Sequence, residues 1–185
     1  MVNIINKFNF HIFMLTSLIS TILVWGTVLV QASIIFIVAL FLLKKFNFIK
    51  KDYLKSLKNY AYPSAFLVSL FAVLGSLFYS QIIGLTPCPL CWWQRIFMYV
   101  LPILIFVGFI LKDKKLPYYI IPLTSIGSFI AIYHYLVQLT PRLTCEGAGI
   151  DCGMVYAFHL GYITIPVMAF TAFLFITIVM LISRK

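Results

Sequence analysis

Long apolar runs, separated by short polar segments, limit the folds open to this chain. A helix needs about 20 consecutive apolar residues to cross a bilayer. Four runs reach that length, at residues 63–85, 93–111, 117–139 and 158–182. The chain is 63% hydrophobic and only 10% charged, with a mean hydropathy of +1.08, which is more apolar surface than a soluble domain can bury. The sequence therefore predicts an all-α integral membrane protein built on a four-transmembrane-helix bundle.

A further uncharged stretch, residues 8–43, precedes these runs. As one helix it would extend about 51 Å, against roughly 30 Å of bilayer hydrocarbon. It is therefore a single crossing with an interfacial lead-in, two short crossings that turn near residues 25–26, or a secretory signal peptide with a cleavage pattern at residues 30–32. The apolar run continues past residue 32 and is long for a signal peptide. The sequence favours one retained transmembrane helix within residues 1–43.

The basic residues, which give a net charge of +10, are distributed unevenly. Eleven of the fourteen lie in alternate polar segments, at residues 44–60, 112–116 and 183–185. By the positive-inside rule these segments face the cytoplasm, so the loops 85–92 and 140–157 lie on the extracytoplasmic side. The positive charge is thus explained by the orientation of the helices, and nucleic acid is not an expected partner.

The segment 44–62 connects the N-terminal helix to the bundle. It is basic and partly amphipathic, and is predicted to be either a short interfacial helix on the cytoplasmic face or a plain charged connector. The polar loop at 112–116 is short, so the helices on either side are expected to be antiparallel neighbours. The predicted organisation is an N-terminal segment over 1–43, this linker, and a bundle over 63–185.

The four cysteines form two pairs, one in each outer loop: Cys88/Cys91 and Cys145/Cys152. On that side of a membrane disulfides persist. A Cys-x-x-Cys pair can close a small redox disulfide or supply half of a zinc site. A disulfide between the second pair would close a ring of about eight residues and stabilise the fold by only roughly 2.5 kcal/mol in the loop-entropy model. Such a weak link suits thiol-disulfide exchange better than a structural role. Both pairs are predicted to be redox-active; a structural clip in the second loop and a four-cysteine zinc site are the alternatives.

Three polar residues accompany the first pair as candidates for binding an electron acceptor. Cys91 is expected to open a helix, where the macrodipole favours the thiolate. Arg95 follows it by one turn on the same face and could stabilise negative charge on a thiolate or a reducible carbonyl, although a snorkelling arginine at the headgroups is the alternative. His134 and Gln138 lie one turn apart near the outer end of the run 117–139, where they could hydrogen-bond a quinone carbonyl.

Taken together, these motifs resemble the disulfide bond formation protein B family. The match is closest to the short, BdbC-like form of that family, in which the second pair is tightly spaced, and residues 160–166 are also similar to that form. The resemblance covers about residues 63–182 and leaves the N-terminal helix and the linker without a counterpart. It rests on Cys88-Pro-Leu-Cys91 with Gln94-Arg95, on Tyr133-His134-Tyr-Leu-Val-Gln138-Leu-Thr-Pro141, and on Cys145 with Asp151-Cys152.

The resemblance implies a multi-pass thiol-disulfide oxidoreductase of the cell membrane. A soluble, extracytoplasmic, thioredoxin-like oxidase would attack the second pair, with Cys145 forming the mixed disulfide and Cys152 as its pair. Electrons would then pass by exchange to Cys88 and Cys91. Because a strongly oxidising partner is reoxidised only by something at least as oxidising, the final acceptor implied is a membrane quinone.

The same resemblance assigns the residues of the quinone site. Cys91, as a thiolate, would form an adduct with ubiquinone or menaquinone. Arg95 would match the quinone-site arginine of the family and His134 the histidine of its third helix, whereas Gln138 is a weaker correspondence. These roles are implied by the resemblance and are not read from spacing.

Two other functions fit parts of the pattern. The vitamin K epoxide reductase family also couples a Cys-x-x-Cys pair to a quinone, but it places its loop cysteines before that pair, and the order is reversed here. A non-enzymatic metal-binding or transport protein could use the cysteines as soft ligands. However, Arg95 apart, the mid-membrane stretches contain no charged residue, so an ion path is difficult to draw and no metal is expected.

Overall fold

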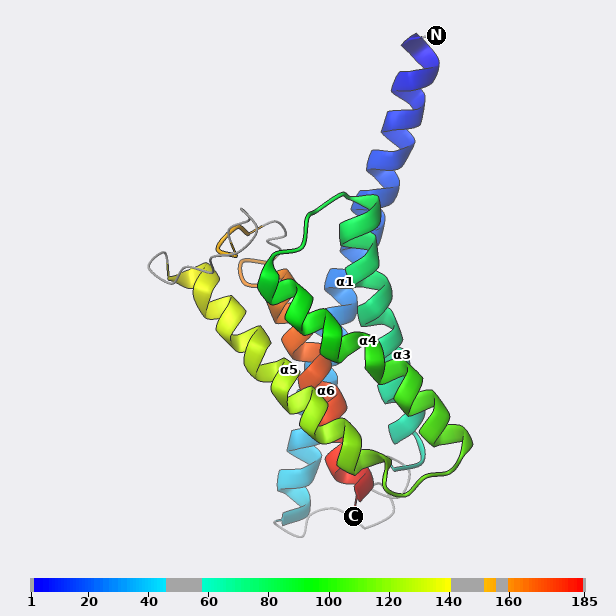
Figure 1. The fold of residues 1–185 in the computed structure, drawn as a ribbon, viewed down its shortest axis with the longest axis vertical. Helices are drawn as coiled ribbons and strands as arrows, with labels where there is room; N and C mark the ends of the chain where they lie inside the picture. Colours follow the sequence, from blue (N-terminus) through cyan, green and yellow to red (C-terminus); the bar gives the residue numbers. More distant parts are fainter. Residues whose placement is uncertain (1, 46–57, 141–151, 156–159, 185) are drawn as a thin grey trace.

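The computed structural model describes every residue except 1, 46–57, 141–151, 156–159 and 185. The described residues form helices and their connections, and five of the helices are long and apolar enough to cross a membrane. The predicted all-α bundle with an additional N-terminal helix is confirmed (Figure 1). The elements are α1 (Val2–Lys45), α3 (Ala61–Leu77), the π-helix η1 (Phe78–Ile82) that continues α3, α4 (Pro89–Ile110), α5 (Leu116–Leu139) and α6 (Ile165–Arg184).

Helices α3 to α6 form the bundle. α5 packs against α4 and α6, and α3 packs against α4 and α6, so the expected antiparallel pairing of α4 with α5 is present. The core contains the fully buried side chains of Leu101, Ile120, Phe173 and Ile176. A Cβ atom added at Gly127 would overlap the ring of Phe173 at Cζ. The small residue thus lets α5 approach α6 closely, as is common where membrane helices pack.

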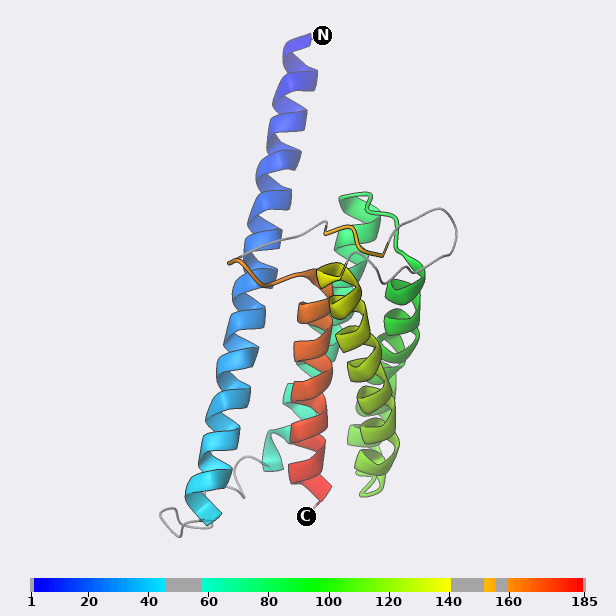
Figure 2. The same cartoon turned by 90° about the vertical axis from the view of Figure 1, so that its left-hand side faces the viewer.

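The N-terminal stretch is one continuous helix, α1, of 44 residues. A double crossing that turns near residues 25–26 is therefore wrong, because the helix runs through these positions without a break. α1 lies along α6 and continues well past the end of the bundle (Figure 2). It is joined to the bundle by Gln31, whose Nε2 donates to Thr171 Oγ1 at 3.2 Å and whose Oε1 accepts from the Tyr162 hydroxyl at 2.8 Å.

α4 begins at Pro89, four residues before the apolar run that predicted it. Cys88 is the N-cap residue, with an extended backbone (φ −69°, ψ 166°), and its sulfur accepts a hydrogen bond from the backbone N–H of Cys91. Proline is well suited to the first helical position, where its missing N–H is not needed. The expectation that Cys91 opens the helix is therefore corrected: Cys88 caps it and Cys91 lies in its first turn.

α6 begins at Ile165, seven residues later than the run 158–182 suggested. Leu160 and Gly161 have φ values of 53° and 79°, in the left-handed region that a right-handed helix cannot contain. Of the basic linker 44–62, residues 46–57 lie outside the described part of the chain, and the interfacial helix considered there stays a prediction.

The described loops fall at two ends of the bundle. The start of α3, the α4–α5 loop and the end of α6 lie together at what we call the basic end, with Lys58, Lys112, Lys114, Lys115 and Arg184. The start of α4 and the end of α5 lie at the opposite end, which we call the cysteine end because it holds Cys88 and Cys152. This separation agrees with the charge asymmetry of the sequence.

Candidate redox site

The first cysteine pair lies at the start of α4. Cys88 is buried, Cys91 is half-buried, and both are free thiols. Their Sγ atoms are 3.1 Å apart, which places them in a hydrogen bond. The capped first turn of α4 thus holds the two sulfurs close enough to form a disulfide with little movement of the backbone.

The surroundings of Cys88 favour its thiolate. The hydrogen bond with the Cys91 thiol is the largest cause that lowers the pKa of Cys88; burial opposes this, and His134, whose Nε2 is 3.7 Å from Cys88 Sγ, lowers the pKa further. The backbone N–H of Cys91, 3.4 Å from the same sulfur, acts in the same direction. Because the thiolate is the form that attacks disulfides, Cys88 is prepared for exchange.

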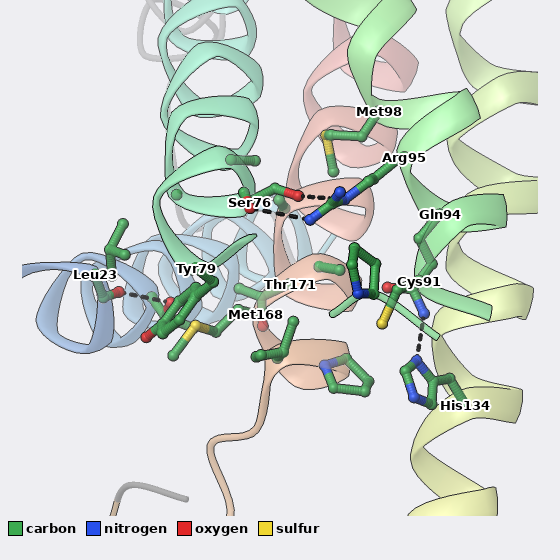
Figure 3. Close-up of a pocket in the computed structure, with 18 of the residues that line it drawn as sticks. Leu23, Ser76, Tyr79, Cys91, Gln94, Arg95, Met98, His134, Met168 and Thr171 are labelled. Carbon is green, nitrogen blue, oxygen red and sulfur yellow. Dashed lines mark hydrogen bonds between the residues drawn. The ribbon is translucent and has the colours of Figure 1, made fainter. Parts of the chain in front are cut away.

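His134 is held in place by Gln94. Gln94 is part of the Cys-x-x-Cys motif region, but the sequence predicted no role for it. The side-chain nitrogen of Gln94 is 2.9 Å from His134 Nδ1, and only 6% of Gln94 and 2% of His134 are exposed. When the amide N–H donates to Nδ1, the imidazole proton is on Nε2, where it can donate to Cys88 Sγ. Gln94, His134 and Cys88 therefore form one buried chain of hydrogen-bonding groups that links α4 and α5. Figure 3 shows its contact between Gln94 and His134.

Part of the second cysteine pair reaches the same place. Cys152 is buried and disulfide-bonded, whereas Cys145 lies outside the described residues. Cys152 belongs to one hydrophobic cluster with Cys88 and Val137, and Cys91 packs against this cluster. The two loops that carry the cysteines thus meet at one end of the bundle, as the sequence predicted from the parity of the helices.

A cavity of about 370 Å³ opens beside the dithiol. At one end it is lined by polar groups: Cys88, Cys91, Gln94, Arg95, His134 and Gln138. The lining from α1, α3, η1 and α6 is mostly apolar, with hydroxyl groups from Thr27, Ser76, Tyr79, Ser80 and Thr171. The cavity thus combines a redox-active, polar end with a hydrophobic interior, and Figure 3 shows its residues reaching inward from different helices.

Arg95 lies on the cavity wall, one turn beyond Cys91. Its Nε donates to the Ser76 hydroxyl at 3.0 Å and one terminal nitrogen donates to the Ser76 carbonyl at 3.1 Å, so α3 orients the guanidinium (Figure 3). The same group lies 5.4 Å from the ring centroid of Trp92. Arg95 is therefore held by contacts within the protein. A snorkelling arginine would not need these contacts, so they favour a role in the site. Ser76 was missed because nothing in its sequence context distinguishes it from other serines.

Gln138 lies on the cavity wall at the end of α5. Its Nε2 is 3.5 Å from the Met154 carbonyl, and its Oε1 is buried with no hydrogen-bond partner in the described part of the chain. A buried acceptor without a partner costs free energy, so it marks a position where a ligand with a donor group would be stabilised. The Oε1 of Gln138, unpaired among the residues that the structure describes, is therefore consistent with a ligand that binds in the cavity.

Cys88, Cys91 and His134 also form a possible metal site. One ligand atom from each residue lies within 4.8 Å of the others. Two sulfurs and an imidazole nitrogen suit zinc, and three protein ligands with an open fourth position are found in catalytic zinc sites. The four-cysteine site considered from the sequence required both loops; here α5 supplies the third donor instead.

Comparison with known proteins gives the family. The family model described as disulfide bond formation protein DsbB matches residues 58–183, which is more than half of the chain. The chain belongs to this family. The order of its cysteine pairs and this match both favour the family over the vitamin K epoxide reductases, and the chain is a multi-pass membrane protein of disulfide bond formation. No solved structure matches it.

Several curated relatives carry names that agree with the family. "SPbeta prophage-derived disulfide bond formation protein B" of Bacillus subtilis (strain 168) is 43% identical over 110 residues, covering 58% of this chain and 74% of the relative. "Probable disulfide formation protein C" of Halalkalibacterium halodurans is 42% identical, covering 65% and 92%. "Disulfide bond formation protein C" of Bacillus subtilis is 39% identical, covering 65% and 90%. The DsbB family match begins after α1, so α1 is an addition to the family's helices.

Proposed function

We propose that this disulfide oxidoreductase reoxidises an extracytoplasmic thioredoxin-like partner and passes the electrons to a membrane quinone. The observation that carries the proposal is the packing of Cys152 and Cys88 in one cluster beside a cavity lined by Cys91 and Arg95. Disulfide chemistry and a hydrophobic binding space are thus in contact. The basic end is assigned to the cytoplasm, which puts the cysteine end on the extracytoplasmic side.

The thiol chemistry proceeds in two exchanges that each move two electrons and two protons. The partner's dithiol is oxidised to a disulfide while the Cys145–Cys152 disulfide is reduced, with Cys145 taking the mixed disulfide. The resulting dithiol then reduces a Cys88–Cys91 disulfide. Attack on Cys91 Sγ releases Cys88 as the leaving thiolate, and His134, whose Nε2 lies 3.7 Å from Cys88 Sγ, can donate a hydrogen bond to that thiolate.

The residues that line the cavity support a quinone as the electron acceptor. A bound quinone accepts two electrons and two protons and leaves as the quinol. In the cavity, the Arg95 guanidinium can donate to a carbonyl oxygen, and His134 lies beside Cys88 to carry a proton. The buried Oε1 of Gln138, an acceptor without a partner among the described residues, suits the hydroxyl of a quinol.

The test is turnover by the purified protein in lipid nanodiscs. A reduced thioredoxin-like oxidase is mixed with quinone, and quinone reduction is followed by absorbance. The wild type should turn over, and Cys91→Ser should abolish turnover without changing the thermal unfolding midpoint. Unchanged turnover in Cys91→Ser would refute the proposal. A Cys152→Ala variant should accumulate a mixed disulfide through Cys145, and mass spectrometry of that adduct identifies the natural partner.

A second candidate is favoured by one observation, the three possible ligand atoms of Cys88, Cys91 and His134. If the protein is a metal-binding protein, the freshly purified chain contains one zinc ion per molecule and turns over no quinone. Replacement of zinc by Co²⁺ would then give thiolate charge-transfer absorption that His134→Ala weakens. For the oxidase we expect the opposite result, turnover with no stoichiometric zinc.

A further inference from the structure

The added helix α1 contributes directly to the cavity beside the dithiol. Its residues Ile22, Leu23, Gly26, Thr27 and Val30 are part of the cavity lining, one helical turn after another. The family match begins only at residue 58, so these residues have no counterpart in it. α1 is thus more than a membrane anchor placed beside a complete enzyme, because it closes one side of the space in which the acceptor is proposed to bind.

The contact between α1 and the bundle is specific. A Cβ atom added at Gly75 of α3 would be 3.0 Å from Cδ2 of Leu23, so the two helices approach closely at this point. Farther along α1, Gln31 shares hydrogen bonds with Thr171 and Tyr162. Interhelical hydrogen bonds and small residues at the contact are what position helices within a membrane. The wall that α1 supplies is therefore held in a defined place.

The polarity of the cavity changes from one end to the other. The two thiols and the guanidinium come from the start of α4, and His134 and Gln138 come from α5. α1 contributes apolar side chains and one threonine, whose hydroxyl donates to the Leu23 carbonyl of its own helix. Further hydroxyl groups of the lining come from α3, η1 and α6: Ser76, Tyr79, Ser80 and Thr171. A membrane quinone has the same division, with a polar ring and a hydrocarbon tail. We propose that α1 forms the wall that receives the tail while the ring lies at Cys91 and Arg95. This inference rests on the proposed function and extends it.

Gly26 is the position that tests the idea. It lines the cavity, and a Cβ atom built on it meets nothing within 4 Å. A leucine side chain there starts in open space at the cavity wall, and leucine has a higher helix propensity than glycine. Gly26→Leu is thus expected to fold normally and to fill the space that the tail occupies. The matched control is Ala32→Leu, an exposed small residue of α1 that is not part of the cavity.

The experiment compares two acceptors that share one ring: 2-methyl-1,4-naphthoquinone, which has no tail, and the same ring with a four-unit isoprenoid tail. KM is measured for each in nanodiscs with a reduced thioredoxin-like oxidase as electron donor. For Gly26→Leu we expect the KM of the tailed quinone to rise about tenfold or more, because methylene-sized changes in an apolar pocket already have effects of that size. The KM of the tailless quinone should change less than twofold, and Ala32→Leu should change neither.

The outcomes separate the inference from the function on which it rests. If the wild type reduces neither quinone, the proposed function fails. If the wild type is active but Gly26→Leu raises both KM values equally, or raises neither, α1 does not contact the tail and only the inference is overturned. Equal effects of Gly26→Leu and Ala32→Leu also overturn it. Thermal unfolding midpoints of both variants are measured to establish that they are folded.

Discussion

Gln94→Leu tests whether the hydrogen bonds from Gln94 through His134 to Cys88 lower the pKa of the Cys88 thiol. Leucine has nearly the volume of glutamine but cannot donate to His134 Nδ1, 2.9 Å away in the structure. The imidazole then becomes free to carry its proton on Nδ1, which turns Nε2 from a donor to an acceptor facing Cys88 Sγ. The Cys88 thiolate thereby loses one of the hydrogen bonds that lower its pKa.

The size of the effect follows from the loss of one hydrogen bond. Such a bond contributes about 0.5–1.5 kcal/mol, and about 1.4 kcal/mol corresponds to one pKa unit. The pKa of Cys88 should therefore rise by up to about one unit, and not all the way to that of an ordinary thiol, because the larger contribution of Cys91 remains. Stability should fall as well, by about 1–3 kcal/mol, since a buried nitrogen of His134 loses its partner.

The assay is alkylation of the reduced protein with iodoacetamide across a pH series, with Cys88 followed by peptide mass spectrometry. Because its pKa is lowered, Cys88 in the wild type should remain reactive below the pH range in which ordinary thiols react, and Gln94→Leu should move the midpoint of its reaction upward. Gln31→Leu is the matched control, since that amide contacts Thr171 and Tyr162 and no cysteine. A Gln94→Leu midpoint equal to that of the wild type would show that His134 does not act on Cys88.

Three other variants test separate features. Cys91→Ala should raise the Cys88 alkylation midpoint more than Gln94→Leu does, because the hydrogen bond with Cys91 is the largest cause of the lowered pKa. Gly127→Ala should lower stability by about 1–3 kcal/mol in denaturant titrations, because its Cβ would overlap the fully buried ring of Phe173. Gln31→Leu should lower stability by about 0.6–2 kcal/mol through the loss of interhelical hydrogen bonds.

The glycine prediction has its own control. Gly26→Ala places a methyl group where nothing lies within 4 Å, so it should be neutral or stabilise α1 by up to about 1 kcal/mol. If Gly127→Ala and Gly26→Ala have the same effect, close packing between α5 and α6 is not what the glycine provides.

Much of the fold could be predicted because crossing a bilayer leaves a strong signal in sequence. The run at 117–139 gave α5 to within one residue, since polar residues and the short loop bound it on one side. The start of α6 was missed because a left-handed leucine at position 160 has no signature in the residue itself. The start of α4 could have been found, since proline is over-represented at the first helical position and Pro89 occupies it.

The site was predicted by residue type but not by contact. Cys88 and Arg95 were singled out from a short motif, and the structure adds that His134 touches the first and Ser76 orients the second. The Gln94–His134 pair joins positions 40 residues apart on two helices, and the rotation of each helix about its axis is not readable from an apolar run. Gln31 could have been found, because an amide in the middle of an apolar membrane helix usually has a polar partner. From the sequence alone, Gln31 stood out only as part of a cleavage pattern at residues 30–32.

The length of α1 has a consequence for how another protein reaches the thiols. At about 1.5 Å per residue its 44 residues extend about 66 Å. The N-terminal part of α1 therefore extends beyond the cysteine end of the bundle, on one side of it (Figures 1 and 2). A globular protein that approached the thiols along the bundle axis would meet α1 on one side. α1 thus limits the directions from which a globular protein could approach the cysteine end.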